Sequence, residues 1–207
     1  KKIIDFLNKE SVDFISSHGH TIFHQPEKRY TLQIGHGQTI ANRTGIKTIN
    51  NFRNLDVSLN GQGAPLVPIG DLHLFKQYKY CINLGGFANI SIKKNNNIIA
   101  FDICPVNIIM NSVSKQLGKD FDENGRIAKR GSIIPQLFKQ LNNLPFYKKQ
   151  PPKSLSREWV NQFINPLLKN EYKKEDILHT ICEHVSVKIS ELINSGETFF
   201  TGGGTFN

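Results

Sequence analysis

Long apolar runs and cysteine pairs are both missing from this sequence. No stretch reaches the roughly 18 apolar residues of a membrane-spanning helix, and no signal peptide is recognised before the first predicted strand. The cysteines Cys81, Cys104 and Cys182 lie far apart, are odd in number and include no CxxC pair. Free thiols in a reducing compartment are the usual meaning of such spacing. We therefore expect a cytoplasmic protein without a membrane partner.

Acidic residues are also in short supply. The chain has 17 Asp and Glu against 26 Lys and Arg, which gives its 207 residues a formal net charge of +9. Such a surface attracts anions, including phosphates, acidic sugars and nucleic acid. The lysines are spread along the chain, however, and the basic and aromatic array of a nucleic-acid reader is absent. A basic nucleic-acid-binding protein remains an alternative based on charge alone, and we expect no nucleic-acid partner.

Several familiar site patterns are absent as well. No glycine run is followed by Lys-Ser/Thr, so the chain is not a P-loop enzyme. His18, His20 and His24 have no partner cluster at metal-ligand spacing. The EF-hand-like start at Asp120 fails because Gly131 stands where a bidentate glutamate belongs. We therefore expect no metal site built from protein side chains.

The most informative stretch that is present runs from Tyr80 to Asp102. Three β-branched and aromatic runs, separated by Gly85-Gly86 and by a Lys/Asn-rich break, predict three strands joined by tight turns. The paired glycines permit positive φ and can turn their amides toward an anion. Asp102 falls where the third strand is predicted to end, a position from which a carboxylate can enter a cleft. On spacing alone, a plain hairpin and a turn or cap residue remain the alternative.

The rest of the chain alternates between strand-like and helix-like segments, which predicts an α/β fold. The ranges expected as strands are 12–16, 31–35, 47–52, 80–84, 87–92, 98–102 and 197–201. The expected helices are 1–9, 38–44, 71–75, 108–117, 127–129 continuing over 133–141, and 176–192. Ser154 or Ser156 is expected to cap a further helix.

Polar residues follow several of these strands. His18 lies in a small polar loop, and Arg53 and Asp56 come just after a later strand. Loops at the carboxyl ends of strands often bind ligands, and an arginine there can grip a carboxylate or phosphate. A solvated histidine and a weak surface ion pair are the alternatives. Gly202–Gly204 follow the last predicted strand and would let a flat base or ribose approach the backbone.

Seven segments, in one order along the whole chain, resemble the anhydro-N-acetylmuramic acid kinases of the actin-like ATPase and sugar kinase superfamily. They are residues 17–21 with 24–26, residues 51–53 with 56–57, residues 61–68, residues 83–90, Phe101-Asp102 with Pro105 and Asn107, residues 151–154 with Arg157-Glu158, and Gly202-Gly203-Gly204 with Asn207. Any one segment is weak evidence, whereas seven in family order are specific.

This resemblance implies a two-lobed actin-like (ribonuclease H-like) fold, with mixed sheets flanked by helices and ATP between the lobes. Residues 1–76 would be part of the first, sugar-side lobe, and residues 77–207 the second lobe with the phosphate hairpin and the adenosine side. The family's first phosphate loop is not found, nor is anything that follows the adenosine glycines. We therefore expect a fragment of such a kinase that lacks both ends.

The resemblance also implies a kinase reaction in peptidoglycan recycling. Water would open the 1,6-anhydro ring of anhydro-N-acetylmuramic acid while ATP, with Mg²⁺ bridging its phosphates, phosphorylates O6 to give N-acetylmuramic acid 6-phosphate. The implied catalytic base is Asp102. The residues implied for ATP are Gly85, Gly86, Asn89, Gly202, Gly203, Gly204 and Asn207, and those implied for the sugar are His18, Arg53, Asp56, Gln62 and Asn107. The expected partners are the amino sugar and ATP, with a homodimer left open.

The chain departs from the family pattern at some positions. Cys104 and Val106 stand where the family has glycines, and we expect their side chains to crowd the loop beside Asp102. Because the family's first phosphate loop is not found, an inactive split-gene fragment without turnover is a second hypothesis beside an active kinase.

Overall fold

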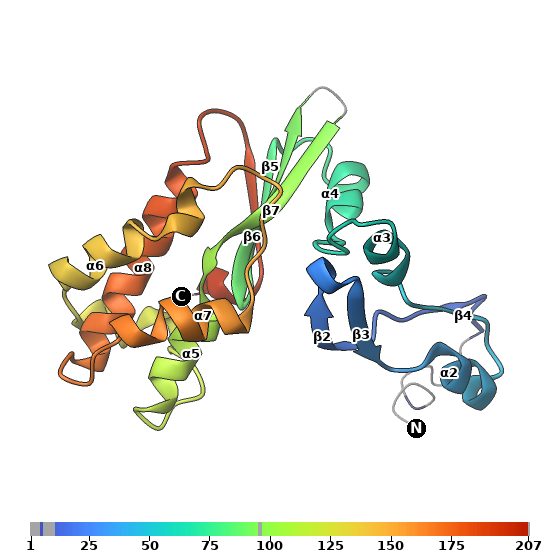
Figure 1. The fold of residues 1–207 in the computed structure, drawn as a ribbon, viewed down its shortest axis with the longest axis horizontal. Coiled ribbons are helices and arrows are strands. Elements are labelled where there is room, and N and C mark those ends of the chain that lie inside the picture. The colour runs from blue at the N-terminus through green and yellow to red at the C-terminus, as the bar shows by residue number, and fades with distance from the viewer. Residues whose placement is uncertain (1–4, 6–10, 95–96, 207) are drawn as a thin grey trace. The chain divides into compact units, whose positions relative to one another are not determined.

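The computed structural model describes residue 5, residues 11–94 and residues 97–206. It divides the chain into two compact units, Lys1–Leu66 and Val67–Asn207 (Figure 1). The sequence predicted a boundary after residue 76 instead. The observed boundary lies earlier than the predicted one because helix α4 (Pro68–Leu74) contacts strands of the second unit. The helix expected over residues 1–9 lies outside the described residues, apart from Asp5.

Unit 1 is built from short strands and short helices. Strand β1 pairs in parallel with β4, and β2 pairs antiparallel with β3. In chain order the elements are β1 (Ile15–Ser16), β2 (His20–Gln25), η1 (Pro26–Lys28), β3 (Tyr30–Ile34), α2 (Gly37–Thr44), β4 (Thr48–Ile49) and α3 (Asn54–Ser58).

Two expectations for unit 1 need correction. The buried strand expected over residues 12–16 is reduced to two residues, and Phe14 is 53% exposed. His20, which the sequence placed in a loop, is the first residue of β2 because its backbone pairs with Ile34 of β3. The predicted helix ending near Gly45 is confirmed: α2 closes on Gly45, whose φ of 71° is in the left-handed region.

Unit 2 contains a four-stranded mixed sheet. The strands are β5 (Tyr80–Leu84), β6 (Phe87–Lys94), β7 (Asn97–Pro105) and β8 (Thr198–Thr201), in the spatial order β7-β6-β5-β8. The first three strands form an antiparallel meander, and β8 joins β5 in parallel. The helices are α4, α5 (Asn107–Lys115), α6 (Pro135–Asn142), α7 (Arg157–Phe163) and α8 (Lys174–Ser190).

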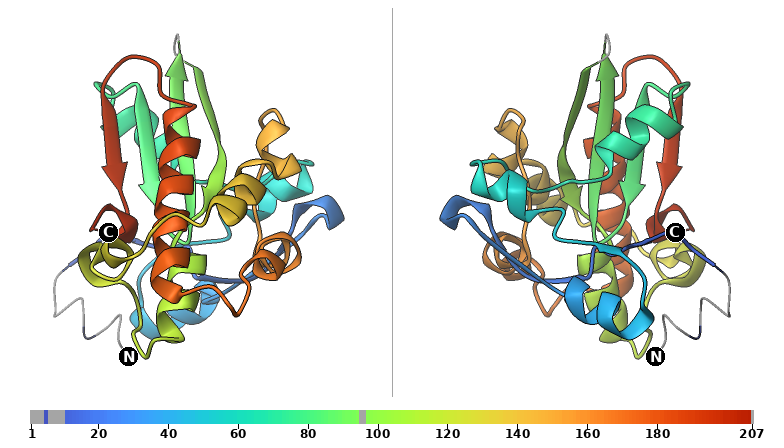
Figure 2. Two further views of the ribbon diagram at one scale, coloured as in Figure 1. Left: turned by 90° about the vertical axis from the view of Figure 1, so that its left-hand side faces the viewer. Right: turned by 90° about the vertical axis from the view of Figure 1, so that its right-hand side faces the viewer.

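Short 3-10 helices connect these elements: η2 (Glu123–Gly125), η3 (Ala128–Arg130), η4 (Pro145–Lys148), η5 (Asn165–Leu167) and η6 (Gly203–Phe206). Helix α8 lies against one face of the sheet and α4 against the other (Figure 2). Ile82, Ile90 and Phe101 of the sheet belong to one buried cluster with apolar residues of α5, α6 and α8. The predicted α/β fold, with a mixed sheet flanked by helices, is confirmed.

Candidate active site

The turn between β5 and β6 holds the paired glycines. Neither Gly85 nor Gly86 has a positive φ, so the turn does not use the left-handed backbone that glycine permits. Instead their carbonyls face the start of α5. The Gly85 carbonyl accepts from the Asn107 amide at 3.2 Å, and the Gly86 carbonyl accepts from the amides of Val106 and Ile108 at 2.9 and 3.1 Å. Among the described residues, none accepts a hydrogen bond from the Gly85 or Gly86 amide, which leaves both amides for a ligand.

A pocket of about 650 Å³ opens beside this turn. Asn107, Asn111 and Lys115 line it from one face of α5, because residues four apart on a helix are neighbours. Arg157, the first residue of α7, lines it as well. Lys115 and Arg157 are exposed cations, and the lining contains no acidic side chain, so the pocket favours anions.

Sequence reasoning missed several of these lining residues. Asn111, Lys115 and Arg157 were not among the predicted site residues, although Asn107 was. The available signal was the four-residue spacing of polar residues at positions 107, 111 and 115, which places them on one face of the helix. Ser156 was a predicted cap, and it does accept a hydrogen bond from the Trp159 amide at 3.3 Å, which starts α7 and places Arg157.

A second pocket of about 450 Å³ shares Asn107 and Asn111 with the first. The aromatic rings of Phe121 and Phe206 line it, together with Gly203, and the acidic residues Asp122 and Glu123 line it as well. The two rings suit a flat, uncharged ring, because aromatic faces stack on planar ligands, while the cations that favour anions line the first pocket. The two adjoining pockets therefore form one groove along α5.

The glycines after β8 are used mainly by the protein's own backbone. A Cβ on Gly202, whose φ is 90°, would come within 2.6 Å of the Leu84 carbonyl oxygen. A Cβ on Gly204 would meet Leu84 Cβ at 2.9 Å. Of the three, only Gly203 lines the second pocket. The predicted Asn207 lies outside the described residues.

Asp102 lies inside β7 and not at its end, because β7 continues to Pro105. It pairs with Asn89 of β6 next to a bulge, where the register shifts between Ala88 and Asn89. Its amide donates to the Lys153 carbonyl at 3.1 Å, and its Oδ2 accepts from the Leu155 amide at 2.8 Å. Burial raises the pKa of Asp102, while the hydrogen bond from Leu155 opposes this rise. A half-buried carboxylate of raised pKa is suited to act as a general base.

Asp102 and Asn89 share one face of the sheet, since directly paired residues project to the same side. Ser91, two residues along β6, projects to that side too and donates to the Asp71 carboxylate of α4 at 2.6 Å. The side chains of Asn89 and Asp102 therefore lie on the α4 face. Asp102 is not among the residues lining the pocket at Gly85 and Gly86, although the two places are close along the β6–β7 ladder.

Cys104 and Val106 were expected to crowd the loop beside Asp102, but their side chains point into the core instead. Their side chains are 0% and 4% exposed and belong to the buried core. Burial raises the pKa of the Cys104 thiol to about 12, which keeps it protonated. The bulge next to Asn89 explains why the Cys104 side chain is buried. It lets Ile103 and Cys104 both join the core while Asp102 faces the other side of the sheet.

The predicted sugar-side residues of unit 1 gather around Arg53. Its Nε donates to His18 Nε2 at 3.0 Å, and its Nη1 donates to the Gly63 carbonyl at 2.6 Å. Since His18 Nε2 accepts, its proton is on Nδ1, which lies 3.1 Å from the Gly19 carbonyl. Burial and the Arg53 charge lower the pKa of neighbouring His24. This cluster is a cationic site anchored by loop carbonyls.

Asp56 holds the glycine-rich loop in unit 1. Its Oδ2 accepts from the Gly63 amide at 2.5 Å, and a Cβ on Gly61 would overlap its carboxylate. Gly63 itself has a φ of 62°, which requires glycine. Asp56 therefore positions the loop, while Gln62, the central residue of Gly61-Gln62-Gly63, is exposed and available. No group of three or more potential metal-ligating side chains occurs within the described ranges. In the same part of the chain, no helix has the length and apolar character needed to cross a membrane.

Comparison with known proteins identifies the family. A sequence model of the family "Anhydro-N-acetylmuramic acid kinase" matches residues 3–207. Relatives of that name from Bacillus cereus strains AH187 and Q1 are each 37% identical over 222 residues, which covers 96% of this chain and 58% of the relative. A relative from Bacillus thuringiensis subsp. konkukian is 36% identical with the same coverage. This chain thus spans 58% of the length of these curated relatives. The chain belongs to the anhydro-N-acetylmuramic acid kinase family.

Proposed function

We propose that this chain carries the nucleotide site and the general base of an ATP-dependent kinase. In that reaction 1,6-anhydro-N-acetylmuramic acid is opened by water and phosphorylated to N-acetylmuramic acid 6-phosphate. The relatives are named for this substrate. The observation that carries the proposal is the pocket where two unbonded glycine amides, Lys115 and Arg157 occur together.

In this proposal the phosphates of ATP lie beside Gly85 and Gly86. Two free amides can donate to phosphate oxygens, and the two cations offset their negative charge. Asn89 belongs to the same hairpin, and Asn107 secures it by donating from Nδ2 to the Leu84 carbonyl at 3.3 Å. The adenosine would lie in the adjoining pocket near Gly203, with Gly202, Gly204 and Asn207 as supporting residues.

Mg²⁺ is proposed to bind with ATP, since magnesium in phosphoryl-transfer sites is usually held by substrate phosphates with only one or two protein carboxylates. When bound, it neutralises charge on the transferring phosphoryl group. The free glycine amides and the two cations of this chain fit the polyphosphate that such an ion accompanies.

Asp102 is proposed as the base that takes the proton of the attacking water. The hydrogen bond from Leu155 to Oδ2 fixes the carboxylate, and Oδ1 has no partner among the residues described here. Burial raises the pKa of Asp102, which makes its carboxylate a stronger proton acceptor.

The sugar is proposed to meet the Arg53 cluster of unit 1. Arg53 uses Nε and Nη1 on His18 and Gly63, and within the described residues its Nη2 has no acceptor. That nitrogen can bind the lactyl carboxylate of the substrate. His18 and Gln62 are proposed as neighbouring sugar contacts, and Asp56 as the residue that positions the loop.

A hybrid kinase tests this proposal, because the chain spans 58% of its relatives' length. In the hybrid, this chain replaces the matching region of the Bacillus cereus AH187 relative. We expect ATP-dependent conversion of the anhydro sugar to its 6-phosphate, measured by mass spectrometry. A folded hybrid that binds ATP but forms no product would contradict the proposed activity.

A further inference from the structure

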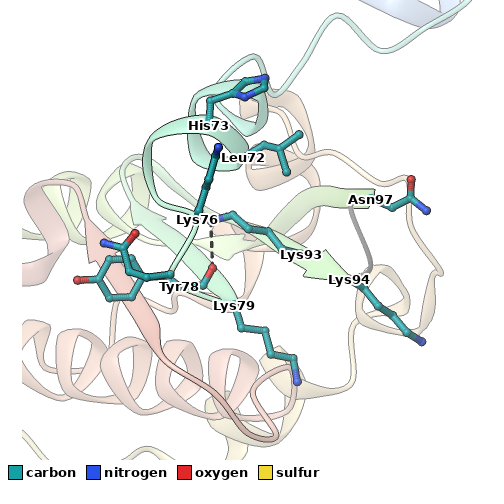
Figure 3. Close-up of a pocket in the computed structure, with 9 residues that line it drawn as sticks. Leu72, His73, Lys76, Tyr78, Lys79, Lys93, Lys94 and Asn97 are labelled. Atoms are coloured by element: carbon teal, nitrogen blue, oxygen red, sulfur yellow. Dashed lines mark hydrogen bonds between the residues drawn. The ribbon is translucent and has the colours of Figure 1, made fainter.

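The strongest unassigned feature lies at the end of the sheet opposite the glycine turn. It is a pocket of about 580 Å³ formed where β5 begins, β6 ends and β7 begins, with α4 and residues 76–79 as its wall (Figure 3). The glycine turn follows the other end of β5, so this pocket is separate from the proposed ATP groove. Its lining residues all belong to unit 2.

The lining is rich in cations and lacks acids. Lys76, Lys79, Lys93 and Lys94 line the pocket together with His73, and no described lining residue is Asp or Glu. None of these lysines takes part in an ion pair within the described ranges. Like charges gathered without counter-charges repel one another, and a bound anion would relieve that repulsion.

Lys93 gives the pocket a fixed, half-buried positive charge. Its ammonium donates to the Tyr78 carbonyl at 3.0 Å (Figure 3). It also donates to the Phe75 carbonyl at 2.5 Å and lies 3.5 Å from Cys81 Sγ. These contacts use its three donors, and none of them is with a carboxylate. The carboxylate of Asp71 accepts from Ser91 instead and does not line the pocket.

Of the other lysines, Lys76 and Lys94 can still reach a ligand. Lys79 is held by the protein itself, because it donates to the Ser195 carbonyl at 2.9 Å and its ammonium lies 5.1 Å from the centre of the Tyr80 ring. Lys76 and Lys94 are exposed and have no hydrogen-bond partner among the residues the structure describes. Lys79 and Lys94 extend toward the same side of the pocket in Figure 3. Asn97 and Gln77 also line the pocket and carry amide donors.

We propose that this pocket binds a small polyanion with two or more phosphate groups. Several cations around one cavity match a ligand of multiple charge, and the free ammonium groups supply charge-assisted hydrogen bonds. A single pocket of this size suits a compact ligand, whereas a nucleic-acid strand needs an extended basic groove with stacking aromatics.

Calorimetric titration with inorganic pyrophosphate tests the proposal. The variant Lys76→Gln/Lys94→Gln removes the two uncommitted ammonium groups. The control Lys129→Gln/Lys139→Gln removes the same charge at exposed positions outside the pocket. All four residues are exposed, so we expect both variants to keep the circular dichroism and melting temperature of the wild type.

We expect the pocket variant to bind pyrophosphate at least about tenfold more weakly than the wild type, a loss of about 1.4 kcal/mol of binding free energy. We expect the control variant to match the affinity of the wild type within about twofold, because its substitutions lie outside the pocket. Equal affinity of the two variants would overturn the proposal, because the retained binding would then belong to net charge or to the glycine groove. Tight binding of single-stranded RNA that is lost in the pocket variant would also overturn it in favour of a nucleic-acid surface.

Discussion

Asp102 is a residue at which folding and the proposed chemistry oppose each other. Burial makes its ionised form less favourable in the folded chain than in the unfolded one, and the Leu155 amide offsets only part of this effect. When a carboxyl group has a raised pKa in the folded state, the free energy of unfolding falls as the pH rises from its unfolded pKa to its folded pKa. Ionisation of the Asp102 carboxyl therefore lowers the stability of the fold.

The substitution Asp102→Asn tests the catalytic role of Asp102 and its effect on stability separately. We expect turnover of the hybrid kinase to fall by a factor of about 10²–10⁴, because a positioned general base is lost. We expect the free energy of unfolding at pH 7 to be unchanged or higher, since a buried charge is removed and Asn can still accept from Leu155. Steady-state kinetics and urea unfolding of the same preparations measure both. Undiminished turnover would refute the assignment of the base.

The substitution Leu155→Pro removes the amide that donates to Asp102. Without that hydrogen bond the pKa of Asp102 should rise further. The acid limb of the kcat/KM profile should then move to higher pH, because the base must be deprotonated. The control Leu155→Ala keeps the amide and should keep the wild-type profile. Equal shifts in both variants would show that the side chain, and not the amide, matters.

The sequence pointed to Asp102 but not to its surroundings. The position of Asp102 near the end of an apolar run is a local property, so pattern reasoning could find it. The Leu155 amide that holds it is more than fifty residues away in the chain, and a single sequence carries no signal for that contact. Likewise Gly85 and Gly86 matter for their unbonded amides and not for a special φ, which only the packing against α5 reveals.

At the scale of elements, α8 buries polar groups that make stability depend on pH. His184 is 2% exposed, with Nε2 2.9 Å from the Tyr147 hydroxyl and Nδ1 3.1 Å from Asn142 Oδ1. Burial, together with the nearby Lys188 charge, lowers the pKa of His184 to about 3. The folded chain therefore resists protonation of this ring, while the unfolded chain accepts a proton near pH 6.5.

This difference predicts acid sensitivity. Below about pH 6.5 the unfolded state binds more protons, so the free energy of unfolding should fall by up to about 1.4 kcal/mol per pH unit from this residue. Urea unfolding at pH 7, 6 and 5 measures the slope. His184→Gln should be less stable at pH 7, because two buried partners lose their hydrogen bonds, but its stability should depend less on pH. If the stability of His184→Gln depended on pH as steeply as that of the wild type, His184 would not be the source of the acid sensitivity.

Element boundaries show where sequence reasoning was limited. The strand predicted over residues 98–102 runs from Asn97 to Pro105 because the partner strand continues, with Phe87 paired to Pro105. Proline is tolerated there since β7 is an edge strand of the sheet. Conversely, the strands predicted at 12–16 and 47–52 in unit 1 are only two residues long. They pair with each other, and this pairing is limited to two residue pairs, Ile15 with Thr48 and Ser16 with Ile49.

At the scale of the whole molecule, the two units differ in how much apolar surface they bury. Among the described residues of unit 1, Val57 is the only buried apolar side chain, while Ile34 and Leu55 are 54% and 71% exposed. Unit 2 contains a continuous cluster that links the sheet to α5, α6 and α8. Burial of apolar surface is the main source of stability, so the two units should differ in their resistance to opening.

Hydrogen exchange measures this difference. We expect amides of β5 and β6 to exchange at least about tenfold more slowly than those of β2 and β3, because local opening of unit 1 exposes little additional apolar surface. Mass spectrometry of peptides from the two units provides the comparison. Equal protection throughout would indicate a single cooperative unit and would contradict this expectation.

The account depends most on the glycine turn as the phosphate site, and calorimetric titration of Mg-ATP into wild type and Gly86→Val tests it most directly. A Cβ at Gly86 meets only Ile108 Cβ at 4.0 Å, so the fold should accept the substitution. The added side chain would occupy the pocket, and we predict at least about tenfold weaker ATP binding with an unchanged melting temperature. Gly70→Val, at a helical position where a Cβ meets nothing within 4 Å, is the control and should bind like the wild type. Wild-type affinity in a folded Gly86→Val protein would contradict the central claim.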